Sequence, residues 1–470
     1  MIFSSIFFIF TFLPLTLLIY YLVPFKAKNL VLLIVSLVFY AWGEPVYVIL
    51  MIFSILINYV SGLEIEAYQE NGEEKKAKYA FIVTLVVNLL VLGFYKYYGF
   101  LISNLNAILP FKIPYKELAL PIGISFYTFQ TLSYVIDVYK GKLNAQKNLI
   151  TFGAYVTMFP QLIAGPIVRY SDVEKQLSER EISRTKVSEG VAYFLRGLGK
   201  KVILANNMGL VSDAVIAMKA AETSALTAWI GAFAYTMQIY FDFGGYSDMA
   251  IGLGKMLGFD FIKNFDYPYI SKSITEFWRR WHISLSSWFK EYVYIPLGGN
   301  RVSKPKAIRN LMIVWCLTGL WHGAAWNFIF WGLYYGIILI LEKYIFKDAI
   351  QKMPGFLQHV YAMVLIMLGW VLFSAPTLGR ALSYMGSMFG IGGGGFVDMT
   401  GFYYLKSTLI LGVLAVLCST PMLYKRFMHM AYTRKKYGQV LYVVAYVGIF
   451  VISIAYLVNA TYNPFLYFRF

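Results

Sequence analysis

Apolar runs of about 20 residues recur along almost the whole chain, and they restrict its fold more than any other feature. A run of this length lets an α-helix cross the hydrocarbon core of a bilayer. Because lipid offers no hydrogen bonds to a backbone, a helix that satisfies its own backbone groups is the expected structure. The sequence predicts spans at residues 3–24, 29–43, 46–63, 79–108, 118–138, 187–218, 224–254, 308–322, 324–343, 356–375, 403–423 and 437–458.

The composition agrees with a chain that lies almost entirely in or against lipid. Of its 470 residues, 59% are hydrophobic and 14% are charged, whereas a soluble protein carries about 25% charged residues. We therefore predict an all-α polytopic membrane protein with about 11–12 transmembrane helices, plus re-entrant or interfacial helices.

The positive charge of the chain indicates its topology. Lys and Arg number 41 against 24 Asp and Glu, a net charge of +17. These basic residues fall in short loops between spans, where the positive-inside rule places them in the cytoplasm. Both chain ends are then expected outside, with Arg380 as an exception on the outer side. No nucleic-acid partner is predicted, and a basic cytoplasmic face favours an anionic substrate.

The stretch "YVTMFPQLIAGPIVRY" (155–170) does not fit a simple span, because Pro160, Gly165 and Pro166 interrupt it. Irregular backbone at membrane depth is tolerated where protein or a water-filled cavity shields it. We predict a re-entrant or buried irregular segment here. By contrast, "IGGGGF" (391–396) is typical of a flexible outer loop.

A second unusual stretch is "SITEFWRRWHISLSSWFKEYVYIPLGGNR" (273–301), which gathers charge, imidazole and aromatic rings. On one continuous helix, Thr275, Arg279, His282 and Ser286 would share a face. This spacing predicts an amphipathic helix at or below the cytoplasmic interface. An interfacial anchor would explain its Trp, Arg and Lys residues, but it needs neither His282 nor the glycine turn.

His322 lies within an apolar run between Arg309 and Glu342. An ionisable group at that depth is costly and indicates a functional site. Gly319 and Gly323 either permit close helix packing or leave room for a substrate beside the ring. The HExxH and GxSxG motifs are absent, and the two cysteines are isolated, so neither a metal site nor a disulfide is predicted.

Asp242 and Asp248 in "YFDFGGYSDMAIGLG" (240–254) fall inside or at the edge of a span. A buried carboxylate needs a partner. We expect each to form a structural ion pair, with Arg279 or Arg280 as the partner.

The chain resembles the membrane-bound O-acyltransferases, and within them the bacterial alginate and peptidoglycan O-acetylation branch. The matching stretches cover nearly the whole chain: "SLVFYAWGEP" (36–45), "PIGISFYTFQTLSYVIDVY" (121–139), "FPQLIAGPIVRY" (159–170), "YFDFGGYSDMAIGLG", "FWRRWHISLSSWFKEYVYIPLGGNR", "GLWHGAAWNFIFWG" and "NPFLYFRF" (463–470). The family's catalytic histidine in "WHG" maps onto His322, and its second histidine maps onto His282. The resemblance implies one family domain over 1–470, with variable spans at 1–115, a histidine-bearing core at 116–345 and C-terminal spans at 346–470.

The resemblance further implies a ring of helices around a central funnel in the cell membrane, with cytoplasmic acetyl-CoA as donor substrate and no resident cofactor. His322 would be the general base and His282 would orient or polarise the thioester, although these roles could be exchanged. The implied partners are an exported SGNH-type protein and an extracytoplasmic polysaccharide, with the polymer left open. The residues expected to bind the donor are Arg279, Arg280, Trp278, Trp281, Lys290, Arg301, Trp321 and Asn327.

The final residues "NPFLYFRF" crowd aromatic rings at the end of the chain. One interpretation is an interfacial aromatic belt. The other is that Tyr467 carries the acetyl group, as the resemblance implies, because a phenol with a pKa near 10 forms an activated ester. Two alternatives to an enzyme also stay open, a transporter or flippase for an envelope precursor and a membrane scaffold for a secreted acyltransferase.

Overall fold

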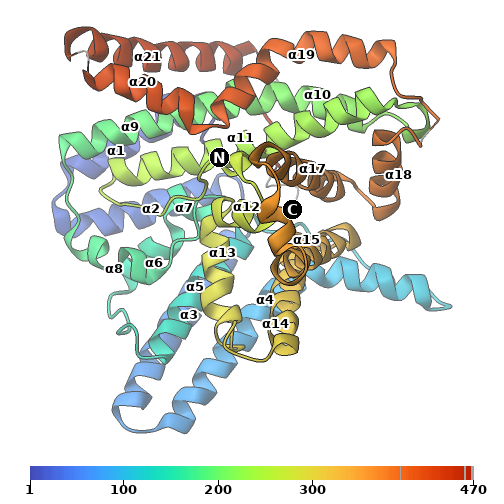
Figure 1. The fold of residues 1–470 in the computed structure, drawn as a ribbon. Coiled ribbons are helices and arrows are strands. Elements are labelled where there is room, and N and C mark those ends of the chain that lie inside the picture. Colours follow the sequence, from blue (N-terminus) through green and yellow to red (C-terminus); the bar gives the residue numbers. More distant parts are fainter. Residues whose placement is uncertain (392, 434, 460–461, 467–470) are drawn as a thin grey trace. The chain divides into compact units, whose positions relative to one another are not determined.

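The structure is a computed structural model that describes residues 1–391, 393–433, 435–459 and 462–466. These residues form helices and connecting loops, and no β-strand occurs among them (Figure 1). The all-α prediction is therefore confirmed. The chain divides into two compact units, Met1–Phe194 with Met249–Ile262, and Leu195–Asp248 with Lys263–Phe470. The internal boundaries predicted at 115 and 345 do not coincide with these units and stay predictions.

The first unit is built around helices that pair through buried polar groups. In the antiparallel pair α3 and α4, the amides of Asn58 and Asn88 exchange hydrogen bonds of 3.0 Å, and Thr84 donates to Ser61 over 2.7 Å. Such bonds hold helices together in lipid, where apolar contacts alone favour no particular partner. The helices of this unit are α1 (Leu13–Leu22), α2 (Lys28–Ala41), α3 (Val48–Glu70), α4 (Glu74–Ile108), α5 (Ile124–Tyr139), α6 (Leu149–Thr157), α7 (Phe159–Leu162), α8 (Tyr170–Glu179) and the first part of α9 (Arg184–Gly199).

Residues 155–170 form the buried irregular segment that the sequence predicts. Helix α6 ends at Thr157, Met158 breaks the helical backbone, and α7 continues for a single turn. Residues 152–168 are all buried in the protein. The shielding protein explains how this irregular backbone is tolerated.

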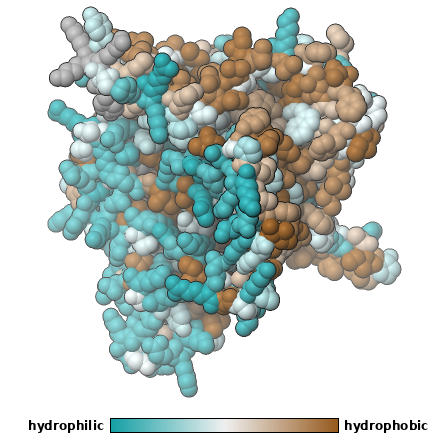
Figure 2. Space-filling model, in the orientation of Figure 1, coloured by the Kyte–Doolittle hydropathy of each residue, from teal (hydrophilic) through white to brown (hydrophobic). Residues whose placement is uncertain are grey.

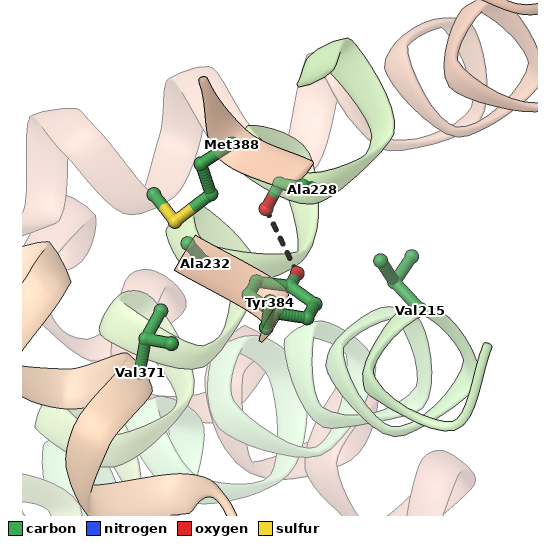
Figure 3. Packing of buried hydrophobic residues seen from close by; sticks show 6 residues of the cluster. All are labelled: Val215, Ala228, Ala232, Val371, Tyr384 and Met388. Atoms are coloured by element: carbon green, nitrogen blue, oxygen red, sulfur yellow. Dashed lines mark hydrogen bonds between the residues drawn. The ribbon is translucent and has the colours of Figure 1, made fainter. Parts of the chain in front are cut away.

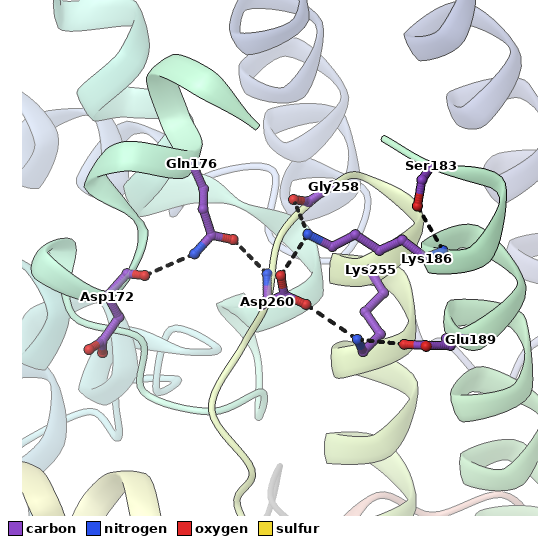
Figure 4. A network of polar contacts seen from close by, with 8 residues as sticks. All are labelled: Asp172, Gln176, Ser183, Lys186, Glu189, Lys255, Gly258 and Asp260. Atoms are coloured by element: carbon purple, nitrogen blue, oxygen red, sulfur yellow. Dashed lines mark hydrogen bonds and ion pairs between the residues drawn. The ribbon is translucent and has the colours of Figure 1, made fainter. Parts of the chain in front are cut away.

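A polar network joins the end of α11 (Ala225–Met256) to α8 and α9 within the first unit (Figure 4). Asp260 forms ion pairs with Lys186 at 2.6 Å and with Lys255 at 3.3 Å. Lys255 also pairs with Glu189 at 2.9 Å. Because Asp260 and Glu189 are more than half exposed, each pair contributes only modestly to stability.

The second unit contains the remaining helices and a compact apolar core (Figure 3). Val215, Ala228, Val371 and Met388 pack around Tyr384, whose hydroxyl donates to the carbonyl of Ala228 over 2.8 Å. The helices of this unit are α10 (Asn206–Ile216), most of α11, α12 (Ile274–Arg280), α13 (Ile283–Phe289), α14 (Lys304–His322), α15 (Trp326–Tyr344), α16 (Lys347–Lys352), α17 (Gly355–Ser374), α18 (Leu378–Met388), α19 (Met399–Cys418), α20 (Pro421–Thr433) and α21 (Lys435–Asn459).

The loop predicted to be flexible is instead fastened to the start of α11. Ala225 and Leu226 donate backbone hydrogen bonds to the carbonyls of Gly395 and Phe396. Asp398 accepts hydrogen bonds from Ser224 and Thr227 at 2.6 and 2.7 Å.

Five helices among the described residues are long and apolar enough to cross a membrane: Val48–Glu70, Glu74–Ile108, Gly355–Ser374, Met399–Cys418 and Tyr437–Asn459. The other predicted spans also fall on helices, although the one at 118–138 begins only at Ile124. Figure 2 shows hydrophobic residues over α19 and hydrophilic residues around the loop between α13 and α14. The helices that carry the candidate active site, α11 and α14, lie outside the five.

Candidate active site

His322 is the last residue of α14, and close packing between α14 and α15 fixes its position. A Cβ atom at Gly319 would lie 2.4 Å from the carbonyl oxygen of Phe328, and one at Gly332 would lie 2.3 Å from that of Trp315. Only glycine permits such contacts, since real Cβ atoms do not approach so closely. Of the two interpretations of the small residues near His322, the structure supports close helix packing.

Aromatic rings enclose the imidazole of His322. The ring centroids of Trp321 and Trp331 lie 5.0 Å away, and that of Phe373 lies 5.3 Å away, all edge-on. The residue is 6% exposed. A charged imidazolium is costly in such surroundings, which suits a base that is neutral before it acts.

His282 does not lie on one continuous helix, so the prediction of an amphipathic helix through 273–301 is wrong. Helix α12 ends at Arg280 and α13 begins at Ile283, with His282 between them in the left-handed conformation (φ 46°, ψ 55°). A non-glycine residue in this conformation is uncommon and costs energy. The break turns the side chain of His282 inward, where it is 1% exposed.

The contacts of Asn264 fix the proton of His282. The backbone N–H of Ser284 donates to Oδ1 of Asn264 over 3.3 Å. A backbone N–H can only donate, so Oδ1 of Asn264 is the acceptor. The same oxygen lies 3.0 Å from Nδ1 of His282. Nδ1 therefore carries the proton, and Nε2 is left with its lone pair. Burial lowers the pKa of His282 to about 3, so the imidazole is neutral at physiological pH.

Trp321 contacts both histidines, and Phe243 contacts His282 and lines the same cavity as His322. Phe243 lies edge-on to His282 with ring centroids 4.7 Å apart. Trp321 lies 5.9 Å from His282 and 5.0 Å from His322. A small cavity of about 10 Å³ lies beside Phe243 and His322, with room for about one water molecule. Its lining residues are Ile239, Asp242, Phe243, Trp281, His322, Trp331, Trp370, Phe373 and Leu466.

The residues predicted to bind the donor occupy two different environments. Trp278 is buried edge-on against Trp315 at 4.7 Å, and Trp281 packs on Trp370 at 4.7 Å beside the cavity. Asn327 is buried and donates to the carbonyl of Ala375 over 3.0 Å, which ties α15 to the end of α17. These side chains build the wall of the site. Their role towards a donor stays a prediction.

The basic residues of 273–301 face outward, with one exception. Arg279, Lys290 and Arg301 are exposed, and no ion pair is recorded for them within the described part of the chain. Arg280 instead pairs with Glu276 at 2.9 Å and with Asp266 at 3.3 Å. The four-residue spacing of Glu276 and Arg280 is a helix pairing that the sequence already displays.

Asp242 and Asp248 form ion pairs, but not with the predicted arginines. Asp242 lies 2.6 Å from Lys201, and Asp248 lies 2.8 Å from Lys200 and 3.2 Å from Arg196. The prediction of Arg279 or Arg280 as partner is wrong because Arg280 is already occupied and Arg279 is exposed. Sequence reasoning missed Lys201, although this lysine falls inside the predicted span 187–218, where a cation needs a partner.

Glu342 was also missed as a structural residue of the site. Its carboxylate accepts hydrogen bonds from the backbone nitrogens of Ile274 at 2.7 Å and Thr275 at 2.8 Å. Charged acceptors satisfy the free N–H groups at a helix start. Glu342 thereby anchors the beginning of α12 to α15 and fixes the register of the segment that leads to His282.

The segment 462–466 reaches the same cavity. Leu466 lines it together with His322, and the ring of Phe465 stacks on Tyr246 at 4.7 Å. Tyr467, the predicted acyl carrier, lies outside the described residues.

Residues 142–382 match the sequence model of the MBOAT, membrane-bound O-acyltransferase family. This chain belongs to the membrane-bound O-acyltransferase family. A protein named "Probable alginate O-acetylase AlgI" from Azotobacter vinelandii is 46% identical over 398 residues, which cover 83% of this chain and 79% of that protein. The "Peptidoglycan O-acetyltransferase" of Helicobacter pylori is 37% identical over 429 residues, covering 84% and 80%.

A more distant relative, the "Teichoic acid D-alanyltransferase" of Bacillus subtilis, is 28% identical over 304 residues, which cover 61% of this chain and 73% of that protein. The membrane-bound O-acyltransferase described here is thus an enzyme of the acyltransferase class and a multi-pass membrane protein. The transporter and scaffold alternatives have no comparable support.

Proposed function

We propose that this membrane-bound O-acyltransferase transfers an acetyl group from cytoplasmic acetyl-CoA, through Tyr467, to an exported serine-bearing partner that acetylates an extracytoplasmic polysaccharide. Two similar relatives have names that describe O-acetylation, one of alginate and the other of peptidoglycan. The enzyme then lies in the cytoplasmic membrane, where it can meet a donor on one side and an acceptor on the other.

One observation carries this proposal. His322 and Leu466 line a single cavity, and Leu466 directly precedes Tyr467 in the chain. Because Tyr467 is bonded to a residue of this cavity, we infer that its hydroxyl comes within reach of the imidazole during the reaction. An acetyl carrier needs this proximity, since the general base must approach the hydroxyl to about 3 Å.

The transfer step is a nucleophilic acyl substitution. The phenol oxygen of Tyr467 attacks the thioester carbonyl and His322 accepts the phenol proton. The carbon–sulfur bond breaks, a carbon–oxygen bond forms, and the leaving thiolate takes a proton to become free CoA. The resulting aryl ester is a good acyl donor, because phenol is a better leaving group than an alkyl alcohol. A partner serine then removes the acetyl group and regenerates the Tyr467 hydroxyl.

The tautomer of His282 refines its predicted role. With the proton on Nδ1, Nε2 can accept a hydrogen bond but cannot donate one to a thioester carbonyl. His282 therefore orients a group that carries a proton, and this group is not the attacking phenol, whose single proton goes to His322. Polarisation of the thioester belongs to another donor of the site, and Trp321, which lies between the two histidines, offers an indole N–H.

The exposed cations of 273–301 suit the donor. Acetyl-CoA carries phosphates, and Arg279, Lys290 and Arg301 are accessible basic groups on the segment 273–301, which contains His282. Arginine in particular binds phosphate in a bidentate manner.

Mass spectrometry of the chain's last peptide tests this function. Purified wild-type enzyme incubated with acetyl-CoA, without partner, should carry an acetyl group on Tyr467. Tyr467→Phe and His322→Ala should not, while both insert and fold as wild type. The phenylalanine variant keeps the ring and removes only the nucleophile. Polymer acetylation at the wild-type rate by Tyr467→Phe would exclude the carrier role.

A further inference from the structure

The segment 462–466 contacts a buried ion pair formed by Lys201 and Asp242. Lys201 is 1% exposed and Asp242 is 2% exposed, and their charged atoms lie 2.6 Å apart. Both groups also bond to the segment. Lys201 donates to the carbonyl of Pro464, and Asp242 accepts from the backbone N–H of Leu466 over 2.8 Å. One charge pair thus holds two peptide groups of the same short segment.

A neighbouring amide extends this contact. Lys201 donates to Asn206 over 2.9 Å, and the amide nitrogen of Asn206 lies 3.2 Å from the side-chain oxygen of Asn463. Further along, the hydroxyl of Tyr462 donates to Asp213 over 2.7 Å. Polar contacts therefore bind the segment at Tyr462, Asn463, Pro464 and Leu466, in addition to the stacking of Phe465 on Tyr246.

The local helix geometry explains why Lys201 points to Asp242. Residues 200–205 form a π-helical turn between α9 and α10, a distortion that changes the direction of successive side chains and is frequent at functional sites. The neighbouring residue Lys200 reaches Asp248 instead, six positions along α11. A Cβ at Gly245 would lie 2.8 Å from the carbonyl of Gly197, so glycine lets the helices approach closely enough for both contacts.

A buried ion pair by itself is weak evidence for stability, because the loss of hydration offsets much of the attraction. Here each charge also forms a hydrogen bond with the backbone of the 462–466 segment, so the segment and the pair stabilise each other. Asp242 and Leu466 also line the cavity of His322. The contact therefore sets where the chain beyond Leu466 starts.

We propose that Lys201 and Asp242 are positioning residues that hold the 462–466 segment against the His322 cavity, so that the residue after Leu466 is delivered to the base. This proposal rests on the proposed function, since Tyr467 is that residue. Asn206 assists through its bond to Asn463. The pair acts through the segment and takes no part in the chemistry.

The test measures both the docking of the segment and the transfer. Leu466→Cys, with Cys316→Ser and Cys418→Ser to remove the other described thiols, reports docking in the purified full chain in detergent. Leu466 is 3% exposed, so a water-soluble maleimide should react slowly with the thiol introduced by Leu466→Cys. The informative variant is Lys201→Met/Asp242→Leu, which leaves no unpaired charge and is expected to fold.

The matched control is Lys200→Met, which removes an ion pair between the same helices that does not bond to the segment and leaves Asp248 paired with Arg196. In Lys201→Met/Asp242→Leu, labelling should rise about tenfold or more. Single-turnover acetylation of Tyr467 should fall by about 10²-fold, with the apparent KM for acetyl-CoA unchanged. Lys201→Arg keeps the charge and should recover part of the rate, whereas the control should label and react as wild type.

Wild-type labelling and transfer in a folded Lys201→Met/Asp242→Leu variant would overturn the proposal. Equal effects in this variant and in the control would do the same, since they would reflect general helix packing. If wild-type enzyme shows no acetyl group on Tyr467, the proposed function fails, and the labelling measurement still decides whether the pair docks the segment.

Discussion

Oδ1 of Asn264 lies 3.0 Å from Nδ1 of His282, and this contact decides which nitrogen of the imidazole carries the proton. The two residues are 18 positions apart and meet because the chain breaks at His282. Among the described residues, the side chain of Asn264 bonds to His282 and Ser284 and does not line the His322 cavity. Its importance for catalysis would follow entirely from its control of His282.

Asn264→Leu should lower the transfer rate by about 10²-fold or more, because the imidazole loses the acceptor that fixes its tautomer. Ser284→Ala is the control, since it removes a hydroxyl that donates to the same oxygen at 2.9 Å and lies 3.5 Å from Nδ1 of His282, and it leaves the contact between Asn264 and the imidazole in place. Transfer by both variants is measured with radiolabelled acetyl-CoA. A rate for Asn264→Leu near that of Ser284→Ala would show that the tautomer does not matter.

The buried neutral His282 should make the fold sensitive to acid. Burial lowers its pKa in the folded state to about 3, whereas the unfolded chain has a pKa of about 6.5. The unfolded state binds the extra proton between these values. His282 therefore destabilises the fold as pH falls below about 6.5, by up to about 1.4 kcal/mol per pH unit. Melting temperatures of wild type and His282→Gln should converge towards low pH, and parallel curves would contradict this.

Gly319→Ala should disturb the active site through the packing of α14 against α15. The added methyl would lie 2.4 Å from the carbonyl oxygen of Phe328, so α14 and α15 must separate, at a cost of about 1–3 kcal/mol. His322, one turn along, would move with α14 and transfer should fall. Gly379→Ala is the control, because its methyl would meet nothing within 4 Å. Thermal unfolding and transfer rate together check the prediction, and equal behaviour of the two variants would refute it.

The exposed cations should affect donor binding more than chemistry. Lys290→Gln/Arg301→Gln removes two accessible positive charges, so the apparent KM for acetyl-CoA should rise several-fold, and less so at high salt, while kcat stays unchanged. Lys347→Gln/Lys352→Gln on α16 is the control, with exposed lysines of the same kind elsewhere. An unchanged KM in the first variant would remove these residues from the donor site.

The sequence predicts the type of fold and the two histidines, because both signals are local. Long apolar runs require helices, and His322 within such a run is conspicuous whatever it contacts. The conformation of His282 was not predictable in this way. Helical periodicity continues through 273–289, whereas the backbone breaks at His282, whose side chain contacts Asn264 and Phe243.

The partners of Asp242 were equally hidden. Lys201 lies 41 positions before it in the chain, and any of several arginines would have satisfied the same rule that a buried carboxylate needs a cation. The choice depends on a π-helical turn and on a glycine contact between α9 and α11. Neither has a clear signature in the pattern of apolar residues.

The contact between Lys201 and Pro464 has a consequence for biosynthesis. The two residues are 263 positions apart, so a ribosome that has already made the lysine and Asp242 must still make α12 to α21 before their last hydrogen-bond partners emerge. Until then Lys201 and Asp242 are paired with each other but lack these hydrogen bonds. Chains truncated before residue 462 would keep this defect permanently. Such chains would contain nearly all of the helices but would leave the pair of Lys201 and Asp242 without its bonds to the 462–466 segment. Membrane proteases that recognise poorly packed segments would then have a physical basis for removing them.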